Sequence, residues 1–164
     1  MADEVIIRDL LAGDEDTIAE IAVLAWTPIY AMYEQLLGKE IFEVAYPNAL
    51  AEKAQQVRAA CDPQHRAMVY VAEANGRVVG FVTFYADDAS GVGEIGNNAV
   101  HPEFQGRGLG RRMYDRVFER LRERGMRVVK VGTGGDPAHA AARRAYEKSG
   151  FSASLPNVTY YREL

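Results

Sequence analysis

The sequence predicts an α/β fold in which one mixed sheet is covered by helices on both faces. Three features support this prediction. Apolar residues recur at helical spacing within residues 14–62, residues 68–100 follow a strand pattern, and the rest of the chain alternates between helix and strand patterns. Helices that alternate with strands in this way pack against the faces of one sheet. At 164 residues the chain has the length of one domain, so residues 1–164 are expected to fold as a single unit.

The N-terminal segment predicts one strand followed by a helix. Residues 5–7, Val-Ile-Ile, form a short β-branched run that favours a strand. Residues 13–16, Gly-Asp-Glu-Asp, end this strand with turn residues and offer capping groups for a helix. Apolar residues then recur at helical spacing from Ile18 to Ala25, which predicts the first helix.

Two prolines are expected to divide the helical region that follows. Thr27 suits the N-cap of a new helix, because Pro28 would then occupy the first helical position, where its missing N–H is not needed. This second helix would end near Gly38, a plausible stop for a helix. Residues 39–62 are again expected to be helical, with a break or a fresh start at Pro47.

The middle of the chain predicts three strands in succession. Asn75-Gly76 is the pair that most favours a two-residue type I′ turn, so the β-rich residues 68–72 and 78–85 are expected to pair as a hairpin. Residues 91–100 have the pattern of a third, central strand. Asn97 and Asn98 are poor strand formers, which predicts a disturbed ladder at this point.

The last third of the chain predicts two helices and the remaining strands. An amphipathic helix is expected over residues 108–124, and residues 127–131 have the apolar character of a buried strand. Asp136 followed by proline predicts the start of another helix, which Gly150 would end. Phe151 and then residues 158–162 are expected to supply the final strands.

Charge and composition exclude several classes of function. The formal net charge is −4, whereas a general nucleic-acid binder would be strongly basic. No apolar run approaches the ~20 residues that span a bilayer, and the acidic N-terminus does not match a signal peptide. The single cysteine, Cys61, cannot form an internal disulfide, which suits a reducing compartment. We therefore expect a cytoplasmic protein without membrane or nucleic-acid partners.

Residues 105–112, QGRGLGRR, place three glycines and three arginines at the start of a predicted helix. This string is not a Walker A loop, and Arg111 stands where the dinucleotide fingerprint counted from Gly106 would need its last glycine. Glycines let backbone N–H groups approach an anion closely, and a helix N-terminus carries about half a positive charge. The stretch therefore predicts a binding turn for an anion such as a pyrophosphate.

Two segments resemble signatures of the GNAT superfamily of acyl-CoA-dependent N-acyltransferases. Residues 99–104, AVHPEF, lead into residues 105–110, which are similar to the superfamily's Gln/Arg-x-x-Gly-x-Gly/Ala pyrophosphate signature. Residues 144–151, RAYEKSGF, resemble its Tyr-Glu-Lys-x-Gly-Phe ending. The resemblance covers residues 66–164 approximately. It implies a mostly antiparallel mixed sheet, acetyl-CoA as the co-substrate and direct acetyl transfer to an amine in a ternary complex.

The resemblance also implies where the cofactor binds. The family places the pantetheine arm along exposed strand backbone and the pyrophosphate on the glycine turn. His139 stands where many relatives have an asparagine that contacts the cofactor, so it either binds the pantetheine, orients Tyr146 through water or is a structural histidine. The implied cofactor-binding residues are Asn98, Ala99, Val100, Gln105, Gly106, Arg107, Gly108, Leu109, Gly110, Arg111, His139 and Tyr146.

Two residues are expected to carry the chemistry. By the same resemblance, Glu94 is the base that takes a proton from the amine, directly or through water, and Tyr146 is the acid for the departing thiolate. Backbone N–H groups around residues 98–100 are implied to stabilise the thioester oxygen. Simple strand alternation would put Glu94, Gly96 and Asn98 on one face, so Asn98 is also expected to contact the substrate or a water molecule.

The sequence suggests the walls of an acceptor site without naming the acceptor. Trp26, Tyr30 and Tyr33 are spaced i, i+4 and i+7, which predicts an aromatic helix face that is either core or pocket. If Trp26 and Tyr30 contact the substrate, a small primary amine with an apolar body would fit. A protein N-terminus or a lysine side chain is an alternative acceptor. A non-catalytic acyl-CoA-binding or sensing module is an alternative function.

The histidines and the single cysteine predict neither a metal site nor a nucleophile. His65, His101 and His139 have no ligand spacing with one another or with Cys61, so no metal is expected. Cys61 has no activating base near it in the sequence and is expected to be an inert thiol. The edge of the sheet would suit pairing with a second copy, so a homodimer is a further expectation.

Overall fold

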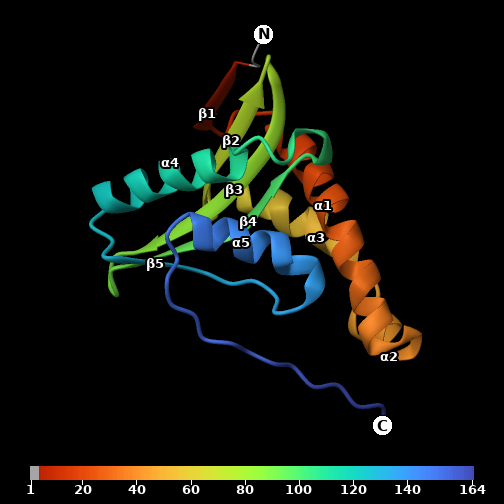
Figure 1. Ribbon diagram of the computed structural model, residues 1–164. Coiled ribbons are helices and arrows are strands. Elements are labelled where there is room, and N and C mark those ends of the chain that lie inside the picture. Colours follow the sequence, from red (N-terminus) through yellow and green to blue (C-terminus); the bar gives the residue numbers. More distant parts are fainter. Residues whose placement is uncertain (1–3) are drawn as a thin grey trace.

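One five-stranded sheet forms the centre of the molecule in the computed structural model, which describes residues 4–164 (Figure 1). The strands lie in the order β1-β2-β3-β4-β5. Neighbouring strands are antiparallel from β1 to β4, and β4 and β5 are parallel. The predicted mixed, mostly antiparallel sheet is therefore confirmed. The strands are β1 Val5–Asp9, β2 Met68–Ala74, β3 Arg77–Asp87, β4 Val92–Val100 and β5 Val128–Val131.

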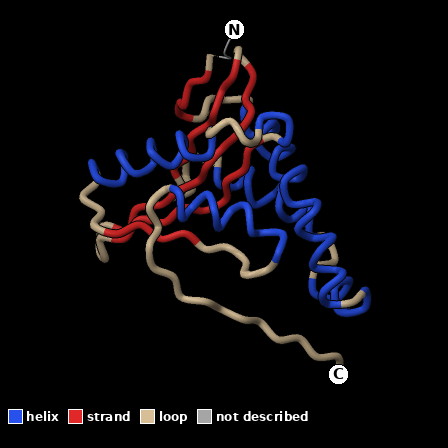
Figure 2. Tube along the Cα trace, in the orientation of Figure 1, coloured by secondary structure: helices blue, strands red, loops and turns tan. Residues whose placement is uncertain are grey.

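Helices cover both faces of this sheet, as the sequence predicted. Figures 1 and 2 show α4 and α5 on one face, with α1 and α3 on the other. Within the described part of the chain, no helix is both long enough and apolar enough to cross a membrane. The helices are α1 Asp14–Leu37, α2 Lys39–Ala45, α3 Ala49–Ala60, α4 Leu109–Glu123 and α5 Ala140–Lys148, with short 3-10 helices η1 Pro102–Phe104 and η2 Pro137–His139.

Strand β3 supplies apolar side chains to a separate core on each face. Phe84 belongs to the core under α4 and α5, where Met113 and Leu121 also pack. Phe81 belongs to the core under α1 and α3, with Ile18 and Val57 as partners. All of these side chains are almost completely buried, and burial of a large apolar side chain contributes about 1.5–3 kcal/mol. These cores hold helices on both faces at fixed positions relative to β4.

The hairpin between β2 and β3 forms at the predicted turn. Asn75 and Gly76 have φ angles of 50° and 77°, so both central residues are in the left-handed region that a type I′ turn requires. Asn75 is the one residue other than glycine among residues 4–164 with a positive φ. The turn fixes the register of the two strands, with Ala74 opposite Arg77.

The prediction that a new helix starts at Thr27 is wrong. Helix α1 runs without interruption from Asp14 to Leu37, and Pro28 lies inside it. The Thr27 hydroxyl donates a hydrogen bond to the Val23 carbonyl, 2.7 Å away, instead of accepting one as an N-cap. Packing of α1 against α3 and the sheet outweighs the local preference of proline for a helix start. The predicted break at Pro47, between α2 and α3, is confirmed.

The final strands that the sequence predicted are absent from residues 151–164. This segment follows α5 as an extended, exposed chain that leads away from the sheet (Figure 2). Val158 and Tyr160 are 69% and 90% exposed. The alternation of side chains that predicted a strand therefore places no residue on a buried face. Tyr161 contacts the rest of the molecule through a 2.8 Å hydrogen bond between its hydroxyl and that of Tyr46.

Arg8 joins β1, the start of α1 and β2 through two ion pairs. Its Nη1 lies 2.6 Å from Asp14 Oδ2, and its Nε lies 2.6 Å from Glu73 Oε2. The three side chains are largely shielded from water. Because Arg8 donates hydrogen bonds to Asp14, the pKa of that carboxyl falls below its ordinary value of 3.8 in spite of the opposing effect of burial.

Replacement of Arg8 by methionine should destabilise the fold in a pH-dependent way. We expect the free energy of unfolding at pH 7 to fall by about 1–3 kcal/mol, because two carboxylates lose their charged donor. Since the pKa of Asp14 is lower in the folded state, its stabilising contribution is present above pH 3.8 and is lost as the pH falls further. The difference in free energy of unfolding between the variant and the wild type should therefore be smaller at low pH.

Urea unfolding at pH 7 and at pH 3 would measure this difference. The matched control is Arg122→Met, which removes an exposed arginine of α4. If the two variants lost equal free energy of unfolding at pH 7, the ion pairs of Arg8 would have no special role in stability.

Candidate active site

Strand β4 and the edge strand β5 separate part of the way along β4. The parallel pairs run from Val92 opposite Val128 to Ile95 opposite Val131, where β5 ends. Residues 96–100 of β4 continue beside β3 alone. A stretch of strand backbone without a partner on one side is the kind of opening that the family resemblance implied for an extended ligand.

Backbone groups of Asn98 and Val100 face this opening. The His101 N–H donates to the Val79 carbonyl, and Phe81 is opposite Ala99, so residues 99 and 101 point their backbone groups toward β3. Alternation along the ladder then turns the backbone groups of residues 98 and 100 away from β3. Ala99 was among the expected cofactor contacts, but its backbone groups lie on the β3 side and its side chain packs against the core under α1 and α3.

A bulge in β4 changes which side chains share a face. Phe84 is opposite Ile95 and Val82 is opposite Asn98, so Gly96 and Asn97 together occupy the space of one partner residue. A Cβ atom on Gly96 would lie 2.6 Å from the Thr83 hydroxyl oxygen, so a glycine is required there. The register shift brings Asn98 onto the face that carries α4 and α5.

The expectation that Glu94 and Asn98 share a face is therefore wrong. Glu94 lies opposite Tyr85 and Lys130, one residue before the buried Ile95, and thus faces the α1 and α3 side. Period-two alternation failed because it took no account of the extra residue in the bulge. The paired asparagines were the one sign in the sequence that the ladder would be disturbed.

Asn98 joins two buried tyrosines on the α4 and α5 face. The Tyr114 hydroxyl donates to Asn98 Oδ1 at 2.6 Å, and Asn98 Nδ2 donates to the Tyr146 hydroxyl oxygen at 3.0 Å. The two tyrosine rings are 5.6 Å apart, and Tyr146 is 7% exposed. In this arrangement Tyr146 accepts from Asn98 and keeps its own hydroxyl proton available for another acceptor.

Burial is the main cause that raises the pKa of Tyr146 and of Tyr114 above the ordinary tyrosine value. Hydrogen bonds to Tyr146 act in the opposite direction without cancelling the effect of burial. Both hydroxyls therefore remain protonated at neutral pH. Sequence reasoning missed Tyr114, which lies among the apolar residues of α4. Its position four residues after Gly110, one helical turn into α4, is the signal that could have found it.

The glycine turn before α4 presents an uncapped helix N-terminus. Gly106 and Gly108 have φ angles of 75° and 77°, and space lies open around both Cα atoms. Gly108 is the N-cap and provides no side chain, so the first N–H groups of α4, from Leu109 onward, have no partner within the helix. Gln105 donates from its side-chain amide to the Val100 carbonyl at 3.1 Å, which ties the turn to the open end of β4.

Two arginines flank the glycine turn at its exposed surface. Arg107 Nη2 donates to the Glu103 carbonyl at 3.1 Å, and its guanidinium lies 4.9 Å from the centre of the Phe104 ring. Arg111 Nε is 3.9 Å from Asp115 Oδ2, an exposed pair that contributes little to stability. The two arginines thus contact groups on either side of the glycine turn, Phe104 before it and Asp115 after it.

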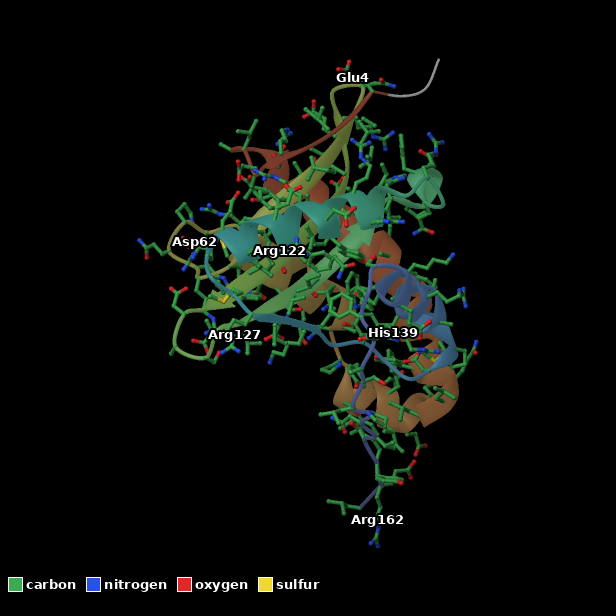
Figure 3. The ribbon with its side chains drawn as sticks, turned by 60° about the vertical axis from the view of Figure 1, so that its left-hand side comes forward. Glu4, Asp62, Arg122, Arg127, His139 and Arg162 are labelled. Atoms are coloured by element: carbon green, nitrogen blue, oxygen red, sulfur yellow. The ribbon has the colours of Figure 1, made fainter. Side chains whose placement is uncertain are left out.

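His139 is held by Asp136 at the junction of η2 and α5. Its Nδ1 lies 2.7 Å from Asp136 Oδ2, and the two side chains are 13% and 14% exposed. Burial acts to raise the pKa of Asp136, but hydrogen bonds from His139 outweigh it and lower that pKa. The His139 ring lies beside Tyr33 of α1, 6.2 Å between ring centres, and Figure 3 shows it where α5 approaches α1 and α2. A side chain on Gly134 would collide with both members of the pair.

Glu94 lies where the opening between β4 and β5 begins, next to a lysine side chain. Its Oε2 is 3.1 Å from Lys130 Nζ, and the carboxylate is about half exposed. Since β4 and β5 still pair at this residue, Glu94 sits at the point where the two strands begin to separate.

The aromatic face of α1 lies outside both cores. Trp26 packs at the edge of the core under α1 and α3. Tyr30 and Tyr33 form an edge-to-face pair with ring centres 5.8 Å apart, and Tyr46 of α2 contacts both rings. None of these rings is fully buried. Tyr30, Tyr33 and Tyr46 thus pack on one another at the surface, while Trp26 packs against the core under α1 and α3.

Cys61 has the properties of an inert thiol. Burial, with a smaller effect of the nearby carboxylates Glu15 and Asp14, raises its pKa to about 11. Its Sγ hydrogen-bonds to the Val57 carbonyl in the last turn of α3. A thiol that is protonated at neutral pH is a poor nucleophile, so the structure agrees with the prediction for this residue.

Sequence relatives of the chain include two acetyltransferases. The chain is 44% identical to mycothiol acetyltransferase of Tsukamurella paurometabola over 89 residues. These 89 residues make up 54% of this chain and 30% of that protein. An N-acetyltransferase of Methanocaldococcus jannaschii is 33% identical over 87 residues, which covers 50% of this chain and 38% of that one. The chain thus spans about a third of the length of these curated relatives.

Solved structures share the fold at low sequence identity. A GNAT-family acetyltransferase from Desulfovibrio desulfuricans superposes with a TM-score of 0.71 at 22% identity, over 93% of this chain and 87% of that one. The PaiA N-acetyltransferase of Thermoplasma acidophilum, solved in complex with coenzyme A, superposes with a TM-score of 0.70 at 16% identity, over 94% and 93% of the chains.

The family is assigned by the match over most of the chain. Residues 31–151 match the model of the acetyltransferase (GNAT) family. This range contains the separated strands, the glycine turn and the Asn98–Tyr146 pair. Taken with the fold, this match shows that the chain belongs to the GNAT acetyltransferase family.

Proposed function

We propose that this protein is an N-acetyltransferase that moves an acetyl group from acetyl-CoA to the primary amine of a small molecule. One observation carries the proposal. The site combines three features along one side of the sheet. They are open backbone on β4, a glycine turn that leaves a helix N-terminus uncapped, and a buried tyrosine whose hydroxyl accepts a hydrogen bond and can still donate its own proton. These are the features needed to bind a long anionic thioester and to protonate its thiolate.

The residues present fit coenzyme A. The pyrophosphate would lie at the uncapped N-terminus of α4, where backbone N–H groups and the cations of Arg107 and Arg111 stabilise negative charge. The backbone of Asn98 and Val100 would hold the pantetheine arm as an additional strand does. When bound, acetyl-CoA supplies the activated acetyl group.

Tyr146 and Glu94 would act on opposite faces of β4. Tyr146 would donate its proton to the departing sulfur, since Asn98 already occupies one lone pair of the hydroxyl. The backbone N–H groups at the opening would stabilise the negative charge that develops on the carbonyl oxygen. Glu94 would accept the proton of the attacking amine, directly or through water, with Lys130 next to its carboxylate.

His139 would help to bind the cofactor and would not take part in the proton transfers. Asp136 accepts from Nδ1, so Nε2 is the nitrogen left for a ligand or a water molecule. The ring lies between Tyr33 and the start of α5, close to the expected path of the pantetheine. We assign it to cofactor binding, in the place where relatives have an asparagine.

Replacement of Gly108 by alanine should weaken coenzyme A binding. A Cβ atom at φ 77° would strain the backbone of the turn that is proposed to hold the pyrophosphate. We expect the Kd for coenzyme A, measured by calorimetry, to rise about tenfold or more, which corresponds to the loss of one charge-assisted hydrogen bond.

Gly125→Ala is the matched control for this variant. Gly125 follows α4 with a φ of 78°, and an added Cβ atom would meet nothing within 4 Å, so the backbone strain is similar at a site far from the turn. An equal rise in Kd for both variants would contradict the assignment of the pyrophosphate to the glycine turn.

Turnover should depend on Tyr146 and on Glu94. Free-thiol release from acetyl-CoA would be measured across amines, amino acids and short peptides. We expect Tyr146→Phe to lower kcat about 100-fold or more on the best acceptor, with Tyr160→Phe, an exposed tyrosine, unchanged. Glu94→Gln should lower kcat/KM most at neutral pH, where a free amine is mostly protonated.

Three outcomes would argue against the proposal in different ways. Unchanged turnover in both variants would contradict the assigned mechanism. Preference for peptides over small amines would favour a protein acceptor. Tight binding of acetyl-CoA without thiol release on any acceptor would favour a non-catalytic binding module.

A further inference from the structure

Lys53 extends from α3 to the bulge in β4. Its Nζ donates to Asn97 Oδ1 at 3.0 Å and to Gln56 Oε1 at 2.7 Å. The same nitrogen lies 4.6 Å from the centre of the Trp26 ring, in a cation–π contact. An ammonium group has three N–H donors, so one remains for a further acceptor.

The partners of this cation within residues 4–164 are all neutral. No carboxylate of the described chain lies within ion-pair distance of Lys53 Nζ, whereas the other lysines near the sheet and α2, Lys130 and Lys39, pair with Glu94 and Glu43. Burial is the cause that lowers the pKa of Lys53, without a compensating negative charge. A partly buried cation without a counter-ion creates a favourable site for an anion.

The position of Lys53 relates this anion site to the reaction. Asn97 lies in the bulge and Asn98 follows it, and their side chains point to opposite faces of the sheet. Asn98 contacts Tyr146 on the face assigned to the departing thiol, and Asn97 contacts Lys53 on the face that carries Glu94 and Trp26. Lys53 is therefore on the side from which an amine would approach the opening.

We propose that Lys53 binds a carboxylate of the acceptor, so that the acceptor is an amine that also carries a carboxylic acid. Trp26 would lie against the apolar part of such a molecule, and Gln56 and Asn97 would keep the ammonium group aimed at the carboxylate. The inference rests on the proposed function and narrows its substrate class from primary amines to amino acids and their close analogues.

Binding can be measured without turnover, because Trp26 is the single tryptophan of the chain. Tryptophan fluorescence would be followed while glycine, L-leucine and L-phenylalanine are added to the protein saturated with coenzyme A. Each amino acid is compared with its carboxamide, which keeps the amine and removes the charge. The phosphonate analogue of phenylalanine tests whether a phosphorus-based anion is preferred.

We expect at least one amino acid to bind about 10- to 100-fold more tightly than its carboxamide, as is typical of a hydrogen bond to a charged group. Lys53→Met should abolish this difference and Lys53→Arg should keep part of it. Lys39→Met, at an exposed lysine of α2, should leave it unchanged. Equal binding of acids and carboxamides, or a preference for the phosphonate alone, would overturn the proposal.

Thiol release on the same compounds separates this inference from the function on which it rests. Turnover of carboxamides and acids at equal rates, equally affected by Lys53→Met, would refute the role of Lys53 and leave the acetyltransferase assignment intact. Lys53-dependent binding of amino acids without thiol release would support the anion site and refute the proposed reaction.

Discussion

The separation of β4 from β5 after Ile95 is the constraint on which the rest of the site depends. A paired ladder would satisfy the backbone groups of Asn98 and Val100, and no extended ligand could then reach them. Pairing with β5 ends at Ile95, while β3 pairs with β4 as far as Val100. The short helix η1 and the glycine turn connect β4 to α4, and Gln105 ties this turn to the Val100 carbonyl, so the N-terminus of α4 lies near the exposed strand.

Burial and charge are distributed unequally across the two faces of β4. On one face, tyrosine hydroxyls are bonded to an amide in a closed environment that keeps them neutral. On the other face, Glu94, Lys130 and Lys53 bring ionic groups to a more open surface. The proposed proton donation to sulfur and the proposed recognition of a polar acceptor would thus take place in surroundings of different polarity.

Sequence reasoning could predict the elements with strong local signals. The Asn75-Gly76 turn, the amphipathic α4 and the proline start before α5 each rest on backbone chemistry that acts within a few residues. The glycine turn was predicted as an anion site from its glycines and the helix start that follows, and the resemblance to known signatures added the pyrophosphate and Tyr146. The failures at Thr27 and at residues 151–164 have another origin, because tertiary packing decides whether a local preference for a cap or a strand is realised.

The site residues that escaped prediction depend on contacts between distant segments. Tyr114 has the sequence pattern of a core residue, and its role appears from its bond to Asn98. The relation of Glu94 to Asn98 could not be obtained by counting, since one additional residue in the bulge reverses the facing of every later side chain. Lys53 carried no signal in the sequence because nothing local links α3 with β4.

The bulge also has an evolutionary consequence. Because Asn97 and Asn98 contact different faces of the sheet, substitutions in α1 and α3 would alter the proposed acceptor side while the tyrosine network on the other face stays untouched. Loss of one residue from the bulge would instead exchange the two faces and disrupt both sets of contacts at once. On the proposed roles, a chain that keeps this bulge could change its acceptor and keep the same proton donor.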